Sequence, residues 1–421
     1  MLQDSPSWVY KGEWNGTLGQ NMFAEFRVGQ FGYNFGLDSN TNATRYESLT
    51  TNEILGGGRG WELRRRRNQY TGALNYFKDN FLGGSHTFKF GGEYLDEKGE
   101  TIWSQGYADN VIQFVNGSLQ GPLSATTPAA VRLWNNVDSW SALATTSLFV
   151  TDSWAIKKLT LNYGLRYDRY RPWLPAQSLA AGRFVPAALD FPQVSDVVTF
   201  NHLVPRIGVT YDLFGDGKTV LKGNWGRFYF NPGITIADAV NPNTADQYAD
   251  WSWNDLNNDR VFEEGEQVVL QTKFGGVANA AVDPNLKNSR GDETSVFVER
   301  AVMNDLGVRV GYVYKKVSDG WQQVNTLRPL SAFNVPVTII DPGPDGSVAT
   351  TADNGTFAFL NLDDPTRGSS QLATPRASTS PAARTRRWRR SRPNGRPPSG
   401  QPWRSSPSPI VRWSRSATSA S

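Results

Sequence analysis

Residues 205–229 read PRIGVTYDLFGDGKTVLKGNWGRFY, and this stretch decides the fold. Apolar side chains alternate with small or polar ones from Ile207 to Leu213, and a second alternating run follows from Thr219 to Trp225. The link between the two runs, Phe214–Lys218, is rich in Gly and Asp. Alternation with a period of two on both sides of a Gly/Asp turn is the strongest short-range signal of a β-hairpin. The stretch therefore predicts two antiparallel strands joined by a tight turn.

Four other parts of the chain show the same pattern. They are Trp8–Tyr33, Gln69–Leu95, Ser147–Tyr170 and Ser295–Val317, with turns at Gly16–Asn21, Leu82–Gly84, Ile156–Lys157 and Asn304–Asp305. We expect ten strands of about 10–12 residues, with two more after Asn334. Long irregular segments separate the hairpins, at residues 34–68, 96–146, 171–204 and 231–294. Short turns at one end and long loops at the other are typical of transmembrane β-barrels, whose strands of ~9–11 residues cross the bilayer at a tilt.

The two faces of the expected strands differ in the way that a membrane barrel requires. In the strand Leu159–Tyr167, every second residue is Leu or Tyr, and the residues between them are Thr, Asn, Gly and Arg. A barrel turns its apolar residues to lipid and its polar residues to the lumen. A soluble β-sandwich or propeller also alternates, but its loops are shorter. The predicted fold class is all-β, an incomplete antiparallel transmembrane β-barrel with short periplasmic turns and long extracellular loops. Aromatic residues such as Trp154 and Tyr170 are expected in the interfacial girdles.

Composition excludes several other classes of protein. The 421 residues have a mean hydropathy of −0.48 and contain no cysteine, which excludes disulfides and thiolate metal sites. No stretch approaches the ~18 consecutive apolar residues of a membrane-spanning helix. The only histidines, His86 and His202, have no recognisable Ser or Asp partner motif, so we expect no enzyme, and we expect His86 to be a polar lumen or turn residue. Residues Met1–Ser7 show no signal peptide, so we expect the N-terminus of the exported protein to lie upstream.

The chain divides into an acidic body and a basic tail near Asp364. Residues 1–364 hold 31 basic and 39 acidic residues, whereas residues 365–421 hold 12 Arg and no Lys, Asp or Glu. The tail is also rich in Ser and Pro, and it lacks the apolar surface that would offset its chain entropy. We therefore predict a partial barrel at residues 1–364 and a disordered tail at 365–421, translated from GC-rich codons out of frame. Reading the DNA in the other two frames should restore alternating strands after Asp364; if neither frame does, the basic tail is real.

The segment Asp255–Glu266 has the spacing of an EF-hand calcium loop. Its oxygen side chains at positions one, three, five, nine and twelve are those of Asp255, Asn257, Asp259, Glu263 and Glu266. An EF-hand requires Gly at position six for its sharp turn, and here that residue is Arg260. Flanking helices are not evident either. Two interpretations stay open, a calcium site and a polar extracellular loop without a metal.

A run of four arginines, Arg64–Arg67, precedes the hairpin Gln69–Leu95. At the end of a barrel loop, these guanidinium groups could bind the phosphates of lipopolysaccharide through bidentate hydrogen bonds. The alternative is a solvated loop end without a ligand. A nucleic-acid partner is not expected, because such a role needs a folded basic surface and the body of the chain is acidic.

The hairpin sequences together resemble those of TonB-dependent receptors. The segments that carry the resemblance are Leu148–Trp154 with Leu159–Asp168, Pro205–Val209 with Gly215–Thr219 and Gly226–Tyr229, and His86–Glu93. The resemblance covers about residues 1–364 and is greatest to the large Oar-like receptors, which carry a carboxypeptidase-regulatory-like domain before the plug. It implies an outer-membrane barrel of 22 strands with an N-terminal plug, neither of which is complete in this sequence.

The function implied by the resemblance is energised uptake of a bulky substrate across the outer membrane. The implied partners are an inner-membrane energy-coupling protein, which would contact the missing plug region, outer-membrane lipid and lipopolysaccharide, and an unknown substrate. The alternative function is that of a secreted, loop-rich β-protein that binds glycans or surfaces. A membrane barrel requires an uncharged outward face about 25 Å tall, and the apolar face of Leu159–Tyr167 favours the first function.

Overall fold

The structure is a computed structural model that describes residues 2–41, 43–104, 110–182, 185–243, 248–274, 280–325, 328–340, 356–363 and 373–377. These residues form mostly β-strands, with one short α-helix, α1 (Thr235–Ala239). No helix among them is long and apolar enough to cross a membrane.

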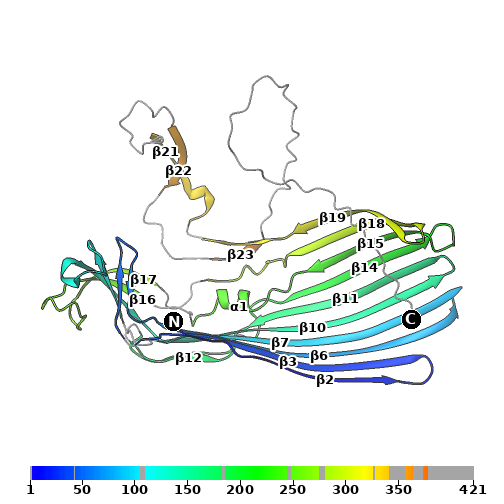
Figure 1. Ribbon diagram of the computed structural model, residues 1–421, viewed down its shortest axis with the longest axis horizontal. Coiled ribbons are helices and arrows are strands. Elements are labelled where there is room, and N and C mark those ends of the chain that lie inside the picture. The colour runs from blue at the N-terminus through cyan, green and yellow to red at the C-terminus, as the bar shows by residue number, and fades with distance from the viewer. Residues whose placement is uncertain are drawn as a thin grey trace.

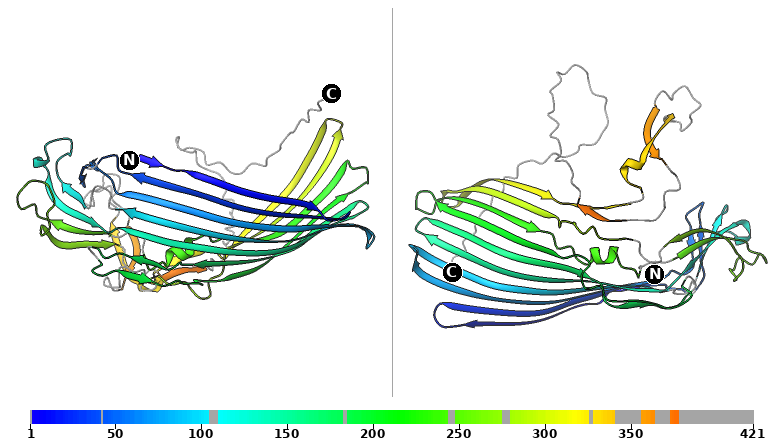
Figure 2. Two further views of the ribbon diagram at one scale, coloured as in Figure 1. Left: turned by 90° about the horizontal axis from the view of Figure 1, so that it is seen from below. Right: turned by 180° about the vertical axis from the view of Figure 1, so that it is seen from behind.

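The largest element is an antiparallel sheet of eleven strands, which we call the main sheet (Figure 1). Its strands are β1 (Leu2–Asp4), β2 (Ser7–Thr17), β3 (Met22–Asp38), β6 (Gly60–Phe81), β7 (Gly84–Ser104), β10 (Val137–Ile156), β11 (Leu159–Trp173), β14 (Phe200–Asp212), β15 (Thr219–Tyr229), β18 (Arg290–Met303) and β19 (Leu306–Ser318). β1 and β2 both pair with β3, and each later strand pairs with the next one in this order. The sheet twists and curves along its length (Figure 2), as right-handed strand twist requires.

All five predicted hairpins are confirmed, with their short turns at the same end of the sheet (Figure 1). The turns use left-handed backbone conformations, for example at Leu82, Gly83 and Lys157. The predicted strand length of about 10–12 residues is wrong for most strands, because β6 has 22 residues and β7 has 21. A strand of this length is more than enough to cross a bilayer. Beyond the bilayer no lipid demands an apolar face, so the alternation in the sequence stops before the strand does.

Strand register places the predicted polar and apolar residues on opposite faces of the main sheet. Leu165 pairs with Val150 and Pro205, whereas its neighbour Arg166 pairs with Phe149 and Val204. Large apolar side chains on one face are well exposed, including Leu148, Val150, Leu165, Ile207, Val296, Val298, Val310 and Tyr312. We call this side the apolar face and the opposite side the polar face. Exposed apolar residues in such numbers indicate contact with lipid rather than water.

The main sheet is open in the described part of the chain, where β2 and β19 form its two edges. The two strands predicted after Asn334 do not extend it. β21 (Phe333–Ile340) and β22 (Thr356–Leu362) form a separate two-stranded sheet. In the predicted tail, only β23 (Ala373–Ala377) is described, paired with β20 (Trp321–Val324). The rest of the tail prediction falls on residues outside the described part.

Three of the predicted loops are not irregular, because they assemble a second sheet of six strands, the loop sheet. The loop between β3 and β6 supplies β4 (Arg45–Ser48) and β5 (Ile54–Leu55), and the loop between β7 and β10 supplies β8 (Asn110–Val115) and β9 (Thr127–Trp134). The loop between β15 and β18 supplies β16 (Tyr248–Trp253) and β17 (Gln267–Phe274). The order is β17-β16-β9-β8-β4-β5, with β4 and β8 parallel. In its described residues, the remaining long loop holds two short paired strands, β12 (Gln177–Leu179) and β13 (Leu189–Phe191).

The loop sheet has a hydrophobic core of its own. Its buried members come from two of the three loops and are Ile112, Phe114, Leu119, Val131, Leu133 and Trp253, with Tyr46 and Leu55 of the third loop packed against them. Ile112 and Phe114 are completely buried. A shared core of this kind makes the three loops one folded unit, because none of them could bury its apolar residues alone.

Candidate functional site

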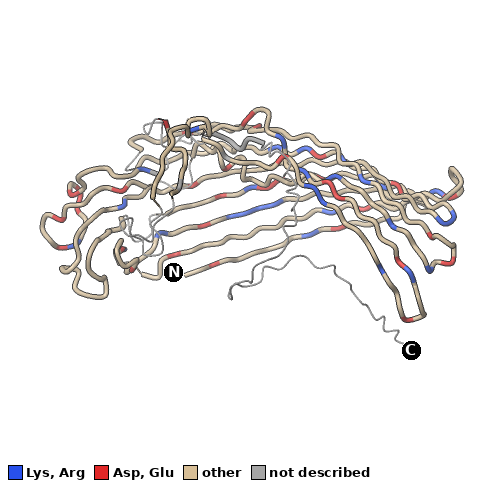
Figure 3. Tube along the Cα trace, turned by 90° about the horizontal axis from the view of Figure 1, so that it is seen from above, with Lys and Arg blue, Asp and Glu red and all other residues tan. Residues whose placement is uncertain are grey.

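Charged side chains on the polar face of the main sheet are joined into networks that cross several strands. Arg27 on β3 donates to Glu25 at 2.9 Å and to Glu13 of β2 at 3.2 Å, and Lys89 of β7 donates to Glu25 at 2.5 Å. Basic and acidic residues recur along most of the long strands (Figure 3), whereas β10 has no Lys or Arg. Exposed ion pairs contribute little singly, but a polar surface of this extent is typical of a water-filled or plugged lumen.

A second network occupies the middle of the polar face. Arg166 of β11 donates to Asp168 at 2.6 Å and to Glu93 of β7 at 3.1 Å. Glu93 also accepts a hydrogen bond from Gln69 of β6 at 2.7 Å, and Asp168 accepts one from Ser147 of β10 at 2.6 Å. Four neighbouring strands are thereby tied together on the side that faces away from lipid.

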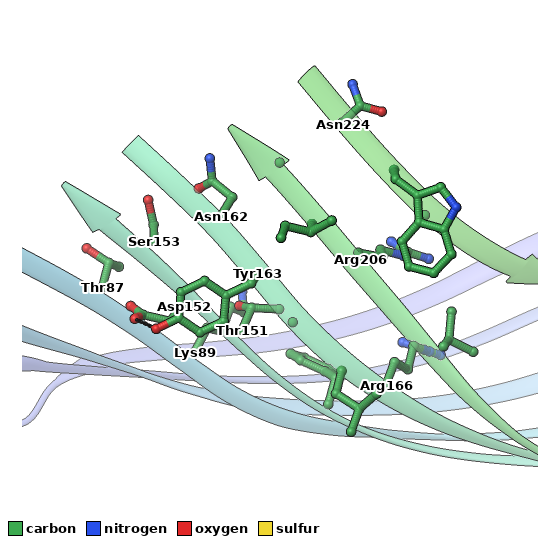
Figure 4. A pocket seen from close by; sticks show the side chains of 18 of the residues that line it. Thr87, Lys89, Thr151, Asp152, Ser153, Asn162, Tyr163, Arg166, Arg206 and Asn224 are labelled. Atoms are coloured by element: carbon green, nitrogen blue, oxygen red, sulfur yellow. Dashed lines mark hydrogen bonds between the residues drawn. The ribbon is translucent and has the colours of Figure 1, made fainter. Parts of the chain in front are cut away.

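Beside this network the polar face is hollowed into a cleft with a volume of about 580 Å³ (Figure 4). Lys89, Arg166 and Arg206 supply its cationic groups. Glycines on this face make room for side chains of β10, since a Cβ atom at Gly91 would come within 2.4 Å of the Phe149 ring, and one at Gly164 within 2.6 Å of Thr151 Cγ2. The cleft is a concave surface that the lumen side offers to a bound molecule or to another segment of a larger protein.

His86 was predicted to be a polar lumen or turn residue, and this is wrong. His86 and Phe88 are two residues apart in β7 and therefore point to the same face of the sheet, which is the apolar face. There His86 is 3 % exposed. Its Nδ1 atom lies 2.7 Å from Asp152 Oδ2, and Tyr163 donates to the same carboxylate oxygen at 2.7 Å. The ring stacks between Phe88 and Trp154. The two side chains are hydrogen-bonded to each other and shielded within an apolar surface, as buried polar groups must be, and the arrangement fits a structural role.

Tyr170 was predicted to lie in an interfacial girdle, and this is also wrong. It is 7 % exposed and belongs to an apolar cluster on the polar face with Leu143, Phe200 and Ile236. The sequence reasoning missed this cluster, because Ile236 comes from a loop whose position no local pattern reveals. His202 lies beside it, stacked on Tyr229 with ring centroids 3.6 Å apart.

The arginine run Arg64–Arg67 lies within β6 and not at the end of a loop, so its predicted position is wrong. Successive residues of a strand point to opposite faces, and the run is therefore divided between the two faces of the sheet. Arg67 pairs with Glu97 at 2.8 Å on the polar face, and Arg64 pairs with Glu62 at 2.7 Å on the other. Arg66 is exposed and aligned with Lys98 of β7, so these two residues are outward cations of this region in addition to Arg64.

The five residues of the predicted calcium loop lie in the turn between β16 and β17. The backbone reproduces the expected sharp turn, since Arg260 at position six has a φ of 63° and Asn258 has a φ of 64°. The Asp255 carboxylate accepts hydrogen bonds from the amides of Asp259 and Arg260 at 3.2 and 3.1 Å. The guanidinium of Arg260 lies 2.5 Å from Asp255 Oδ2. The Arg260 guanidinium thus forms an ion pair with the carboxylate that would be the first ligand of a calcium ion.

Glu266, the twelfth residue of the same loop, is buried and fully engaged. Its carboxylate accepts hydrogen bonds from Trp253 Nε1 at 3.0 Å, from the Glu263 amide at 2.9 Å and from the Leu256 amide at 3.0 Å. Burial raises the pKa of Glu266, but these hydrogen bonds outweigh burial and hold the pKa below its ordinary value of 4.5. In the described part of the chain, no three His, Cys, Asp or Glu residues are grouped as a metal site requires. Calcium binding by this loop stays a prediction.

A stack of aromatic and guanidinium groups connects the main sheet to the loop sheet. Arg59, next to the start of β6, lies between Trp103 of β7 and Trp134 of β9, with its guanidinium carbon 4.9 and 4.2 Å from the two ring centroids. Trp103 also stacks on Trp61 at 5.6 Å, and Arg59 donates to the Asn135 carbonyl. Cation–π contacts of a shielded guanidinium are worth up to about 2 kcal/mol. The stack therefore attaches β9 of the loop sheet to β7 of the main sheet.

A family model described as "Outer membrane beta barrel domain" matches residues 3–381. The chain belongs to the outer membrane beta barrel domain family. The fold class and the location in the outer membrane that the sequence predicts are thereby confirmed.

The individual outer-membrane proteins that resemble the chain are only distantly similar to it in sequence. The TonB-dependent transporter Oar of Myxococcus xanthus is 25% identical over 195 residues, which are 40% of this chain and 17% of that protein. The outer membrane transporter YddB from Escherichia coli is 14% identical, with a TM-score of 0.49 over 86% of this chain and 38% of YddB. The ferric-catecholate import receptor Fiu from Escherichia coli is 12% identical, with a TM-score of 0.44 over 77% of this chain and 42% of Fiu.

The family match and the similarity to Oar confirm the resemblance to TonB-dependent receptors that the hairpin sequences predict. They also confirm the prediction that the chain is not an enzyme. The chain spans less than half the length of each of these relatives. The secreted β-protein considered as an alternative is not supported, because members of the outer membrane beta barrel domain family lie in the membrane.

Proposed function

We propose that this outer membrane beta barrel domain forms the wall of a TonB-dependent transporter that imports a bulky substrate. The observation that carries the proposal is the polar face, where ion-pair networks cross β2 to β11 behind a face of exposed apolar residues. A surface of this kind lines a passage of water or a plug. The similarity to the TonB-dependent transporter Oar supports energy-coupled transport over passive diffusion.

Two partners follow from this proposal. An inner-membrane energy-coupling protein would act through a plug region, and the cleft beside Arg166 offers the plug or the substrate a cationic concave surface. Lipopolysaccharide would contact the outward cations Arg66 and Lys98, although Asp96 lies 3.9 Å from Lys98 and offsets part of its charge. The loop Asp255–Glu266 is the candidate calcium site of the extracellular side.

The test of the transport proposal compares cells that have the protein with cells that lack it. Culture supernatants are analysed for large solutes that only the first cells remove, with and without a protonophore. We expect selective removal of at least one bulky solute, and its loss when the proton-motive force is abolished. Uptake that continues at the same rate with the protonophore would show a passive channel and contradict the proposal.

A further inference from the structure

Positively charged side chains of three strands gather on the apolar face of the main sheet. We call them the cation cluster, and they are Arg66 of β6, Lys98 of β7, and Arg169 and Arg171 of β11. Residues an even number of positions apart in a strand point to the same face. Arg169 and Arg171 therefore share the face of Leu165, and Lys98 shares the face of Phe90, which pairs with Val150. Both Leu165 and Phe90 are exposed on the apolar face.

The strand between β7 and β11 carries only small side chains at this level. Lys98 is paired with Ala142 of β10, and Arg171 is paired with Ala144 of the same strand. The Lys98 ammonium reaches across β10 to within 5.5 Å of the centroid of the Trp173 ring. Since neighbouring strands lie about 4.8 Å apart, β7 and β11 are separated by about 10 Å. One bound molecule can therefore contact cations on both sides of β10.

The protein itself neutralises little of the charge of the cation cluster. In the part of the chain that the structure describes, none of the three arginines of the cluster forms an ion pair. Lys98 lies 3.9 Å from Asp96, which is a loose contact. By contrast, Arg64 on the same face pairs with Glu62 at 2.7 Å. Cations that are close together repel one another, and a bound anion removes this repulsion.

The cation cluster begins where the apolar residues of its strands end. On β11 the exposed Leu165 and the half-buried Tyr167 precede Arg169, and on β7 the exposed Tyr94 precedes Lys98. The short turns that join β6 to β7 and β10 to β11 lie at the other ends of these strands (Figure 1). Short turns of such barrels are periplasmic. The cluster is therefore at the level of the lipid headgroups of the outer leaflet.

We infer that the cation cluster binds the phosphate groups of a lipopolysaccharide molecule. Arginines donate bidentate hydrogen bonds to phosphate, and a lysine adds a compact charge. Lipid A, the anchor of lipopolysaccharide, carries phosphates at both ends of its disaccharide, and these fit cations on both sides of β10. The exposed Leu165 and Tyr94 would contact its acyl chains. The inference rests on the lipopolysaccharide contact in the proposed function and extends it to Arg169 and Arg171 of β11.

The test measures the affinity of the purified whole protein in detergent for lipid A with both phosphates. EDTA is present, so that no divalent cation bridges phosphate to a carboxylate. Arg169→Gln with Arg171→Gln should weaken binding at least ten-fold, because two charge-assisted contacts are lost. If this variant does not fold, Arg169→Lys with Arg171→Lys keeps the charges, loses the bidentate geometry and should weaken binding several-fold.

The matched control removes two positive charges from the opposite side of the sheet. Arg309 and Lys315 of β19 pair with Glu299 and Glu293 on the polar face. Arg309→Gln with Lys315→Gln should bind lipid A as the unaltered protein does. Heat-dependent mobility on gels confirms that each variant is folded. Equal affinity of the folded β11 variants and the unaltered protein would overturn the inference.

Two further probes identify the lipid. Dephosphorylated lipid A tests whether the phosphates are recognised, and phosphatidylglycerol tests whether the phosphate of an ordinary phospholipid is enough. Both should bind at least ten-fold more weakly than lipid A with its phosphates. Equally tight binding of either probe would overturn the assignment to the phosphates of lipopolysaccharide. The measurement needs neither a transported substrate nor a proton-motive force, so a failure of energised uptake leaves this inference unaffected.

Discussion

Arg132 of β9 donates two hydrogen bonds to the Asp250 carboxylate of β16, at 2.7 and 2.9 Å. The two residues belong to different loops of the main sheet, and they are directly paired in the loop sheet. The Arg132 guanidinium also lies 4.1 Å from the centroid of the Tyr248 ring. The hydrogen bonds to Asp250 raise the pKa of Arg132 further above its ordinary value. This pair is the clearest polar link between two loops.

Removal of this link should loosen the loop sheet. We expect Arg132→Ala to lower the local free energy of opening of β9 and β16 by about 1–3 kcal/mol, because a partly buried carboxylate loses its partner. Hydrogen exchange followed by mass spectrometry measures this opening strand by strand. Arg45→Ala, which removes a pair within β4, is the matched control and should have a smaller effect. If β16 exchanges at its normal rate in Arg132→Ala, the link has no role in joining the loops.

Acid should open the turn between β16 and β17. The pKa of Glu266 is held below 4.5 in the folded state, so its stabilising contribution is complete above 4.5 and is lost as the pH falls through the folded value. Hydrogen-exchange protection of residues 255–266, corrected for the intrinsic rate at each pH, should decrease below about pH 4.5. Glu266→Gln should abolish this pH dependence, whereas the exposed Glu264→Gln should retain it. A pH profile shared by both variants would contradict the assignment.

Calcium should protect the same turn if the predicted site exists. We expect millimolar calcium to slow proteolysis of residues 255–266 and Glu266→Ala to remove this protection. Arg260→Gly should strengthen the protection, because the guanidinium that lies 2.5 Å from the first ligand is gone and Gly adopts the left-handed turn freely. Equal cleavage in calcium and in chelator, in both the native chain and Arg260→Gly, would leave only the metal-free loop.

The assignment of the two faces predicts opposite outcomes for two neighbouring substitutions in β10. Val150 is exposed on the apolar face, and an arginine in this position should destabilise the folded barrel by up to about 4 kcal/mol, because its charge would face lipid. Thr151 lines the cleft on the polar face, and an arginine there should have little effect. Folding into lipid vesicles, followed by heat-dependent mobility on gels, distinguishes the two. Equal destabilisation by both variants would show that the faces are wrongly assigned.

The sequence predicts the hairpins of the main sheet well because their information is local. A Gly/Asp turn and alternation with a period of two are both read within about 25 residues, as in Pro205–Tyr229. The register of β14 and β15 then follows from the turn. Lipid no longer requires apolar residues in the N-terminal half of β6. The alternation of apolar and polar residues is lost there, and the predicted strand is therefore shorter than the observed one.

The contacts between loops could not be predicted, because they join residues that are far apart in the chain. β9 pairs with β16 although more than a hundred residues separate them in the chain. In both strands the alternation of apolar and polar residues is too short to predict which strand is the partner. The same holds for Ile236 and Tyr170, whose contact depends on how a loop returns to the wall. For the candidate calcium loop, the spacing in the sequence predicts the five oxygen ligands, but it could not reveal the contact of the Arg260 guanidinium with the Asp255 carboxylate.

The shared core of the loop sheet constrains how these surfaces can diversify. Loops that stand alone can be lengthened, shortened or exchanged one at a time, and receptor families use this freedom to change what they recognise. Here a substitution at Phe114 in one loop alters the surroundings of Trp253 in another, since their rings meet edge to face at 5.9 Å. The three loops must therefore vary together, and a graft of this surface onto another barrel would have to carry all three at once.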